Sequence, residues 1–197
     1  PELAKFCYTY LLNKRKVARF FFDHKWISPF TKEWGVWNDQ QVPNTYSVYG
    51  DIVMETLLHG LKEKMEKETG YKLQETYAYA RIYKTGDVLH RHKDRYSCEV
   101  STTLNLGGEA WPIYLEPSGK KGMAGIKVDL EPGDMLLYSG CELEHWRDAF
   151  PGKDCGQVFL HYNDRTQKTA KENIYDRRPF LGLPAWFQGF KLPPKKK

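Results

Sequence analysis

From Tyr71 onward the chain consists of short segments in which apolar and polar residues alternate, separated by turns of Gly, Pro, Asp and Lys. Alternation with a period of two is typical of strands that bury one face. The segments read "ETYAYARIY", "CEVSTTLNL", "PIYLEP", "AGIKVDLEPG", "DMLLYSG" and "GQVFLHYN". Short strands at regular spacing behind a helical start predict an α+β chain, mostly β, with helices packed on an antiparallel β-sandwich or small barrel.

Residues 51–69 give the clearest helical pattern ahead of that region, and Gly70 stands where a helix commonly stops. One face of this expected helix carries Val53, Leu57, Leu58, Leu61 and Met65. Another helix is expected over residues 2–12, where helical spacing relates Leu3, Phe6, Tyr10 and Leu11. The next run, "VARFFFDHKWI", fits a strand or a helix, and residues 30–47 are expected to form an ordered loop.

The length of 197 residues suits one domain spanning residues 1–197. Within it we expect helical support over about residues 1–70, a β core over about residues 71–165 and a C-terminal extension over about residues 166–197. Hydrophobic residues make up 41% and charged residues 28% of the chain, as in ordinary soluble globular proteins.

Charge and cysteine content indicate which partners and which cellular compartment are expected for the chain. The net charge of +5 is mild and is concentrated in residues 14–16 and 195–197, which indicates solvated surface rather than a nucleic-acid-binding face. Four cysteines without a CxxC pair favour a reduced, intracellular and cytoplasmic protein over a disulfide scaffold. No run of about eighteen apolar residues is present, so no membrane span is expected. Whether a targeting segment precedes Pro1 is not decided by the sequence.

The segment "HRHKD" places His90, His92 and Asp94 within five residues. Side chains two apart on a strand share a face, so His92 and Asp94 can converge on one point. His90 is also in phase, either as a third member or as a neighbour, and such clusters also occur in solvated turns. His145, in "LEPGDMLLYSGCELEHWRD", is a further candidate on a later strand, unless it only packs beside Trp146. Two histidines and one carboxylate form the facial ligand set of non-haem Fe(II) oxygenases.

The stretch "YKTGDVLHRHKD" resembles the Tyr-x-x-Gly-x-x-hydrophobic-x-x-His-x-Asp signature of prolyl-4-hydroxylase-like Fe(II)/2-oxoglutarate-dependent dioxygenases. The matching positions are Tyr83, Gly86, Leu89, His92 and Asp94. "STTLNL" resembles the family's following strand, "EPGDMLLYSG" resembles its Pro-Gly-led strand, and His145 matches its second histidine. The resemblance covers about residues 75–164 and selects His92 over His90, because Asp94 stands two residues after His92.

This resemblance implies a double-stranded β-helix, or jelly roll, with supporting N-terminal helices. It implies an oxidoreductase with the metal ligands His92, Asp94 and His145, which uses Fe(II), 2-oxoglutarate and O₂, with ascorbate as a supporting reductant. The implied reaction hydroxylates a peptidyl, prolyl-type side chain and releases succinate and CO₂. Tyr83 matches the family tyrosine that helps to hold the cosubstrate, unless its ring only fills the barrel. Thr103 stands where the family often has a tyrosine, so its hydroxyl is a candidate contact for the cosubstrate.

The chain departs from the family pattern at Cys155, where most members carry the Arg or Lys that binds the distal carboxylate of 2-oxoglutarate. A buried carboxylate without a partner is costly, so another cation must replace it. We expect Arg147 in this role, because it shares a strand face with His145 and a guanidinium grips a carboxylate through two hydrogen bonds. The alternatives are Lys153 and Arg81, or an Arg147 that lies on the surface beside Asp148.

Three functions remain open at the level of the sequence. The first is a hydroxylase acting on a peptide or protein, with a small-molecule substrate as an alternative, and it rests on the family resemblance. The second is an oxidative demethylase of nucleic acid, supported only by the basic C-terminal tail. The third is a non-catalytic barrel that binds a small anion or a protein, which Cys155 favours and the histidine and aspartate set opposes.

Overall fold

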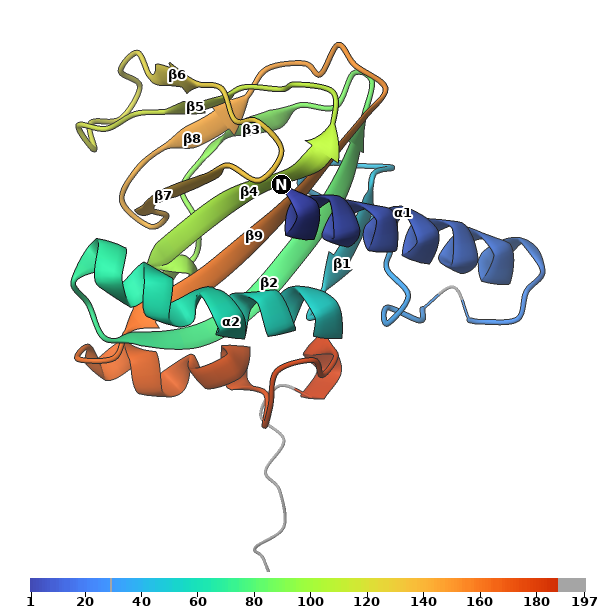
Figure 1. Cartoon of the computed structure of the whole chain (residues 1–197), viewed down its shortest axis with the longest axis horizontal. Helices are drawn as coiled ribbons and strands as arrows, with labels where there is room; N and C mark the ends of the chain where they lie inside the picture. The colour runs from blue at the N-terminus through green and yellow to red at the C-terminus, as the bar shows by residue number, and fades with distance from the viewer. Residues whose placement is uncertain (29, 188–197) are drawn as a thin grey trace, which may run out of the picture.

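The computed structural model describes residues 1–28 and 30–187, in which two antiparallel sheets pack against each other and two helices cover the larger sheet (Figure 1). The larger sheet has the order β1 (Tyr46–Tyr49), β2 (Leu73–Lys84), β9 (Asp154–Asp164), β4 (Val100–Gly108) and β7 (Met135–Ser139). The smaller sheet has the order β3 (Leu89–His92), β8 (His145–Arg147), β5 (Ile113–Leu115) and β6 (Ile126–Val128). The chain is mostly β, and the arrangement is the expected jelly roll.

Helix α1 (Glu2–Asp23) and helix α2 (Ile52–Thr69) lie on the outer face of the larger sheet (Figure 1). Asp51 begins α2, because its carboxylate accepts hydrogen bonds from the backbone N–H groups of Val53 and Met54. Gly70 ends this helix in the left-handed conformation, with φ of 73°. The helix predicted over residues 51–69 is therefore confirmed at both ends.

Helix α1 differs from its expectation in length and in orientation. It continues through the first part of the run that fits a strand or a helix and ends at Asp23. Leu11 is buried as expected, but Leu3 and Phe6 are exposed. Small side chains, Ala4, Cys7 and Ala18, face the sheet instead, because close approach of a helix to a sheet leaves little room for large side chains.

Alternation along the central strands separates a helix-facing surface from a surface that faces the smaller sheet. On β2, Ala78, Ala80 and Ile82 join the core under the helices. The intervening residues of β2 line a cavity between the sheets, and they are Tyr77, Tyr79, Arg81 and Tyr83. The inner face of the barrel is thus aromatic and polar, which is the composition of a binding site rather than of a packed core.

Beyond β9 the chain forms three short 3₁₀ turns, η2 (Lys168–Glu172), η3 (Ile174–Arg177) and η4 (Ala185–Phe187). A buried ion pair joins this segment to α2, with Arg178 Nη2 2.5 Å from Glu55 Oε1. A second pair joins it to the barrel through both terminal nitrogens of Arg95, which donate to the carboxylate of Asp176 at 2.7 Å. Within the described part of the chain, no helix has the length and apolar character needed to cross a membrane.

The strands expected after Tyr71 are all present, and the Pro-Gly turn precedes β7 as expected. Strand β1 begins at Tyr46, inside the segment 30–47 for which the sequence predicts a loop. It forms because Tyr46–Tyr49 pairs antiparallel with residues 79–82 of β2, and a pairing partner distant in sequence leaves no local pattern. The basic residues 195–197 lie outside the described residues.

Candidate metal centre

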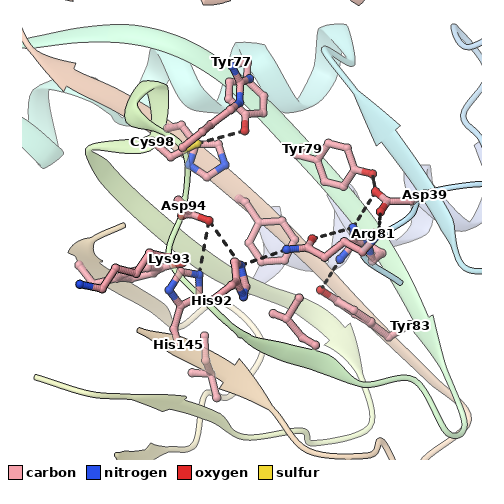
Figure 2. A pocket seen from close by; sticks show the side chains of 17 residues that line it. Asp39, Tyr77, Tyr79, Arg81, Tyr83, His92, Lys93, Asp94, Cys98 and His145 are labelled. Atoms are coloured by element: carbon pink, nitrogen blue, oxygen red, sulfur yellow. Dashed lines mark hydrogen bonds and ion pairs between the residues drawn. The ribbon is translucent and has the colours of Figure 1, made fainter. Parts of the chain in front are cut away.

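His92, Asp94 and His145 come together at one end of the cavity between the sheets (Figure 2). His92 on β3 and His145 on β8 are cross-strand partners, so the register of the smaller sheet brings them together. The Nε2 atoms of both rings lie 3.5 Å from Oδ1 of Asp94. One ligand atom from each residue lies within 4.8 Å of the other two, a spacing that could hold a metal ion.

The hydrogen bonds of the two histidines prepare the same nitrogen for coordination. His92 Nδ1 lies 2.7 Å from the backbone oxygen of His90, and His145 Nδ1 lies 3.1 Å from that of Leu143. An Nδ1 that faces a carbonyl must carry the proton, so the lone pair of the neutral ring is on Nε2. Both lone pairs therefore point toward Asp94, as in metal sites whose histidines are oriented by backbone carbonyls.

Asp94 supplies negative charge to this cluster at neutral pH. Burial acts to raise the pKa of Asp94, but side-chain hydrogen bonds from His145 and His92, which form when their Nε2 atoms carry a proton in the absence of a metal, outweigh burial and lower the pKa overall. A carboxylate and two imidazole nitrogens directed at one point are a suitable donor set for a divalent transition metal. The residues present therefore fit the implied Fe(II).

The cluster opens onto a cavity of about 330 Å³, a size suited to a small organic ligand. Its walls combine the inner face of β2 with apolar side chains of both sheets, namely Leu89, Ile113, Tyr138 and Phe159. The ring of Tyr138 packs edge-on against His145 at 4.8 Å between centroids. Apolar side chains therefore form part of the cavity wall next to the metal cluster.

Arg81 and the loop before β1 form the cavity wall that adjoins the cluster at His92 (Figure 2). Arg81 donates to Asp39 Oδ2 at 2.8 Å, to Gln41 Oε1 at 3.1 Å and to the hydroxyl of Tyr83 at 3.1 Å. The amide of Gln41 in turn donates to His92 Nε2 at 3.0 Å. Burial acts to lower the pKa of Arg81, but Tyr83, Tyr79 and Asp39 raise it overall.

Arg147 is fully buried and faces the same side of β8 as His145, while Trp146 between them stacks on Tyr114. Its surface placement beside Asp148 is therefore excluded. Two residues along a strand span about 7 Å. Arg147 therefore lies at a distance from His145 that is similar to the length of a short dicarboxylate.

The described hydrogen-bond partners of the Arg147 guanidinium are all neutral. They are the backbone oxygen of Trp111, Thr103 Oγ1 at 3.4 Å and Gln157 Oε1 at 3.3 Å. Burial lowers the pKa of Arg147, and its buried Nε has no hydrogen-bond partner among the described residues. A buried cation without an anionic partner is costly, so this site is suited to a carboxylate from a ligand.

The remaining candidates for cosubstrate binding separate clearly. Tyr83 is fully buried and lines the cavity, and Thr103 contacts Arg147 directly. Lys153 is exposed and is not among the residues that line the cavity. Arg81 lines the cavity but already pairs with Asp39. Arg147 and Thr103 are also absent from the cavity lining, but Arg147 interacts electrostatically with Tyr83, which lines it. Because its hydrogen-bond partners among the described residues are neutral, Arg147 remains the better candidate for a carboxylate, and Thr103 contacts it.

Several polar residues around the cluster were not predicted from the sequence. Ser101 and His161 lie behind Asp94, with Ser101 Oγ 3.0 Å from Asp94 Oδ2 and 2.9 Å from His161 Nδ1. Both lie at positions that the alternation of the predicted strands assigns to the inward face, so the sequence could have indicated them. Asp39 and Gln41 lie in an aperiodic loop, and no sequence pattern marks them.

The sequence matches no family model and no curated protein. Among solved structures, the chain is similar to a prolyl-4-hydroxylase from Pseudomonas putida, with a TM-score of 0.59 and 12% identity over 83% of this chain and 87% of that chain. It is also similar to two α-ketoglutarate-dependent enzymes of nogalamycin biosynthesis. The epimerase SnoN has a TM-score of 0.57 and 15% identity over 84% of this chain and 73% of that one. The carbocyclase SnoK has a TM-score of 0.53 and 11% identity over 79% of this chain and 75% of that one. These similarities establish the fold as the double-stranded β-helix that these enzymes share.

Proposed function

We propose that the chain is an Fe(II)- and 2-oxoglutarate-dependent oxygenase. The observation that carries the proposal is the convergence of His92, Asp94 and His145 at the end of a cavity. The buried Arg147 nearby has no anionic hydrogen-bond partner in the part of the chain that the structure describes. The similarity of fold to three proteins whose names include prolyl-4-hydroxylase or α-ketoglutarate dependence supports it. When bound, Fe(II) and 2-oxoglutarate would supply the oxidising chemistry, with release of succinate and CO₂.

Each group of the cavity has a defined task under this proposal. His92, Asp94 and His145 hold the metal through one face and leave the opposite face open to ligands. Arg147 binds the distal carboxylate of 2-oxoglutarate, and Thr103 donates a further hydrogen bond. Tyr83 closes the cavity beside the cosubstrate, while Leu89, Ile113 and Phe159 exclude water from it.

For the substrate we propose a peptidyl, prolyl-type side chain. The tyrosine rings of β2 line the cavity together with the Arg81 and Asp39 pair, and aromatic walls suit an apolar ring presented by an extended peptide. SnoN and SnoK favour a small molecule as the second candidate, since their names place them in nogalamycin biosynthesis. Nucleic-acid demethylation has no support within residues 1–28 and 30–187, because the basic tail that suggested it lies outside them.

Succinate formation tests the proposal. Aerobic incubation of the protein with Fe(II), 2-oxoglutarate and ascorbate should yield succinate without added substrate, through uncoupled turnover, and His92→Ala should abolish it. Prolyl peptides and small cyclic compounds can then be compared by the succinate each one stimulates. A parent protein that retains no metal and forms no succinate would refute the oxygenase and favour the non-catalytic barrel.

A further inference from the structure

The carboxylate of Asp94 is held by two different environments, one at each oxygen. Oδ1 faces the Nε2 atoms of His92 and His145 at 3.5 Å. Oδ2 points the other way, into the barrel wall, where Ser101 Oγ lies 3.0 Å away. The two oxygens of one ligand are therefore not equivalent.

Ser101 and His161 are direct cross-strand partners on β4 and β9. Ser101 Oγ is within hydrogen-bond distance of three atoms: Asp94 Oδ2 at 3.0 Å, the backbone oxygen of Cys98 at 2.9 Å and His161 Nδ1 at 2.9 Å. The first two can only accept, and the hydroxyl has one proton to give. A proton on His161 Nδ1 directed at Ser101 Oγ leaves the serine proton for an acceptor, and the charged carboxylate is the stronger one.

The backbone at Gly140 packs closely against Oδ2 beside Ser101. A side chain at Gly140 would place its Cβ 2.6 Å from Asp94 Oδ2 and 2.5 Å from Ser101 Oγ. The backbone is fixed at the same point, since the Asp94 N–H donates to the carbonyl of Gly140 at 2.8 Å. Oδ2 therefore occupies a closed cradle formed by Ser101 and the backbone at Gly140.

These residues do not form a second metal site, although Asp94, Cys98 and His161 also bring ligand atoms within 4.8 Å of one another. The Cys98 sulfur is 3.1 Å from the hydroxyl of Tyr77, and burial raises the pKa of the Cys98 thiol. A protonated thiol is a poor ligand. Ser101 Oγ also already occupies the hydrogen-bonding positions of Asp94 and His161.

We propose that Ser101, oriented by His161, holds Oδ2 of Asp94 so that Asp94 offers only Oδ1 to the metal. Ser101 and His161 are thus positioning residues, and they rest on the metal site of the proposed function. Asp94 that bound through both oxygens would fill a fourth coordination position. Monodentate Asp94 leaves three positions open, which a chelating cosubstrate and O₂ require.

Ser101→Ala tests this with Mn(II) alone, in the absence of 2-oxoglutarate. Loss of a group that orients a metal ligand typically weakens metal binding about ten- to a hundredfold, so the Mn(II) dissociation constant should rise by that factor. The electron paramagnetic resonance of bound Mn(II) in ¹⁷O-enriched water reports the bound waters. We expect one fewer water in Ser101→Ala than in the parent, because the freed Oδ2 takes one position.

Thr102→Val is the matched control, since it removes a buried hydroxyl from the next residue of β4. Among the described residues, this hydroxyl bonds the backbone of Leu160 alone. It should leave both Mn(II) readouts at parent values. His161→Phe should reproduce the loss of water seen in Ser101→Ala. Unchanged Mn(II) affinity and water number in folded Ser101→Ala would overturn this inference alone. A parent protein that binds no Mn(II) would overturn the proposed metal site with it.

Discussion

Replacing Arg147 by Met should abolish the recognition of the distal carboxylate of 2-oxoglutarate while leaving the metal site intact. Removing one partner of a buried charge pair costs about 2–5 kcal/mol. At about 1.4 kcal/mol for each factor of ten, the affinity for 2-oxoglutarate should fall roughly thirty- to several-thousandfold. The Mn(II) dissociation constant should remain within about twofold of the parent, because hydrogen bonds of Arg147 reach none of the three ligands.

The same substitution should not unfold the protein. Loss of the donor to the backbone oxygen of Trp111 costs about 1–3 kcal/mol. Burying a cation without an anion costs several kcal/mol, and the lowered pKa of Arg147 reflects that burial. Arg147→Met removes both contributions, so the free energy of unfolding of the ligand-free variant should equal or exceed that of the parent in urea denaturation.

Calorimetric titration of Mn(II)-loaded protein with two ligands isolates the contact. 2-Oxobutyrate carries the same keto acid end as 2-oxoglutarate but lacks the distal carboxylate. The parent should prefer 2-oxoglutarate, and Arg147→Met should bind both ligands about equally. Lys153→Met, at an exposed position, is the control and should keep the preference. If Arg147→Met keeps the preference and Arg81→Met loses it, the assignment of Arg147 is refuted in favour of Arg81.

Three further predictions concern Gln41, Asp51 and Asp176. Gln41→Ala frees Nε2 of His92 from a hydrogen bond worth about 0.5–1.5 kcal/mol, so Mn(II) affinity measured by titration should rise about two- to tenfold; weaker binding would contradict this. Asp51 caps α2 and accepts from Tyr10 and Lys14, so Asp51→Ala should lower the free energy of unfolding in urea by about 3–5 kcal/mol, and a loss under about 1 kcal/mol would contradict it. Burial acts to raise the pKa of Asp176, but hydrogen bonds from Arg95 outweigh burial and lower the pKa. The contribution of ionised Asp176 to the stability of the folded protein is therefore complete above about pH 4, and it is lost as the pH falls through the lowered pKa. The stability deficit of Asp176→Asn relative to the parent should therefore shrink between about pH 5 and about pH 3, and a constant deficit would contradict this.

The fold was predictable where burial acts on one strand or helix at a time. The strands after Tyr71 and the helix at Ile52–Thr69 each bury one face, and the spacing of their apolar residues shows which face that is. Strand β1 and the orientation of α1 depend on partners distant in sequence, namely β2 and the outer face of the larger sheet. The period of a sequence segment does not depend on partners distant in sequence, so these two features could be identified only from the three-dimensional structure.

The candidate site divides along the same line. Strand phase predicted that His92 and Asp94 converge, the family resemblance added His145, and Arg147 was predicted from the phase of His145; the structure places the first three side chains together. Asp39 and Gln41 are held at the cavity by contacts with residues distant in sequence, namely Arg81 and His92. A loop has no regular residue period, so the sequence does not predict the direction in which its side chains point.

Cys155 and Arg147 belong to one chain of hydrogen bonds inside the barrel. The Cys155 sulfur accepts a hydrogen bond from Gln157 at 3.2 Å, and Gln157 in turn accepts one from Arg147. Arg147 also acts electrostatically on the Cys155 thiol, so its guanidinium lies next to the position where the resembling family has its cation. Strands β8 and β9 belong to different sheets that face each other, so a side chain from either can enter the same space. A guanidinium from β8 would then exclude a second cation from β9, because two like charges in one buried space repel. A small neutral residue at Cys155 is therefore the expected companion of Arg147, and the departure from the pattern supports the assignment.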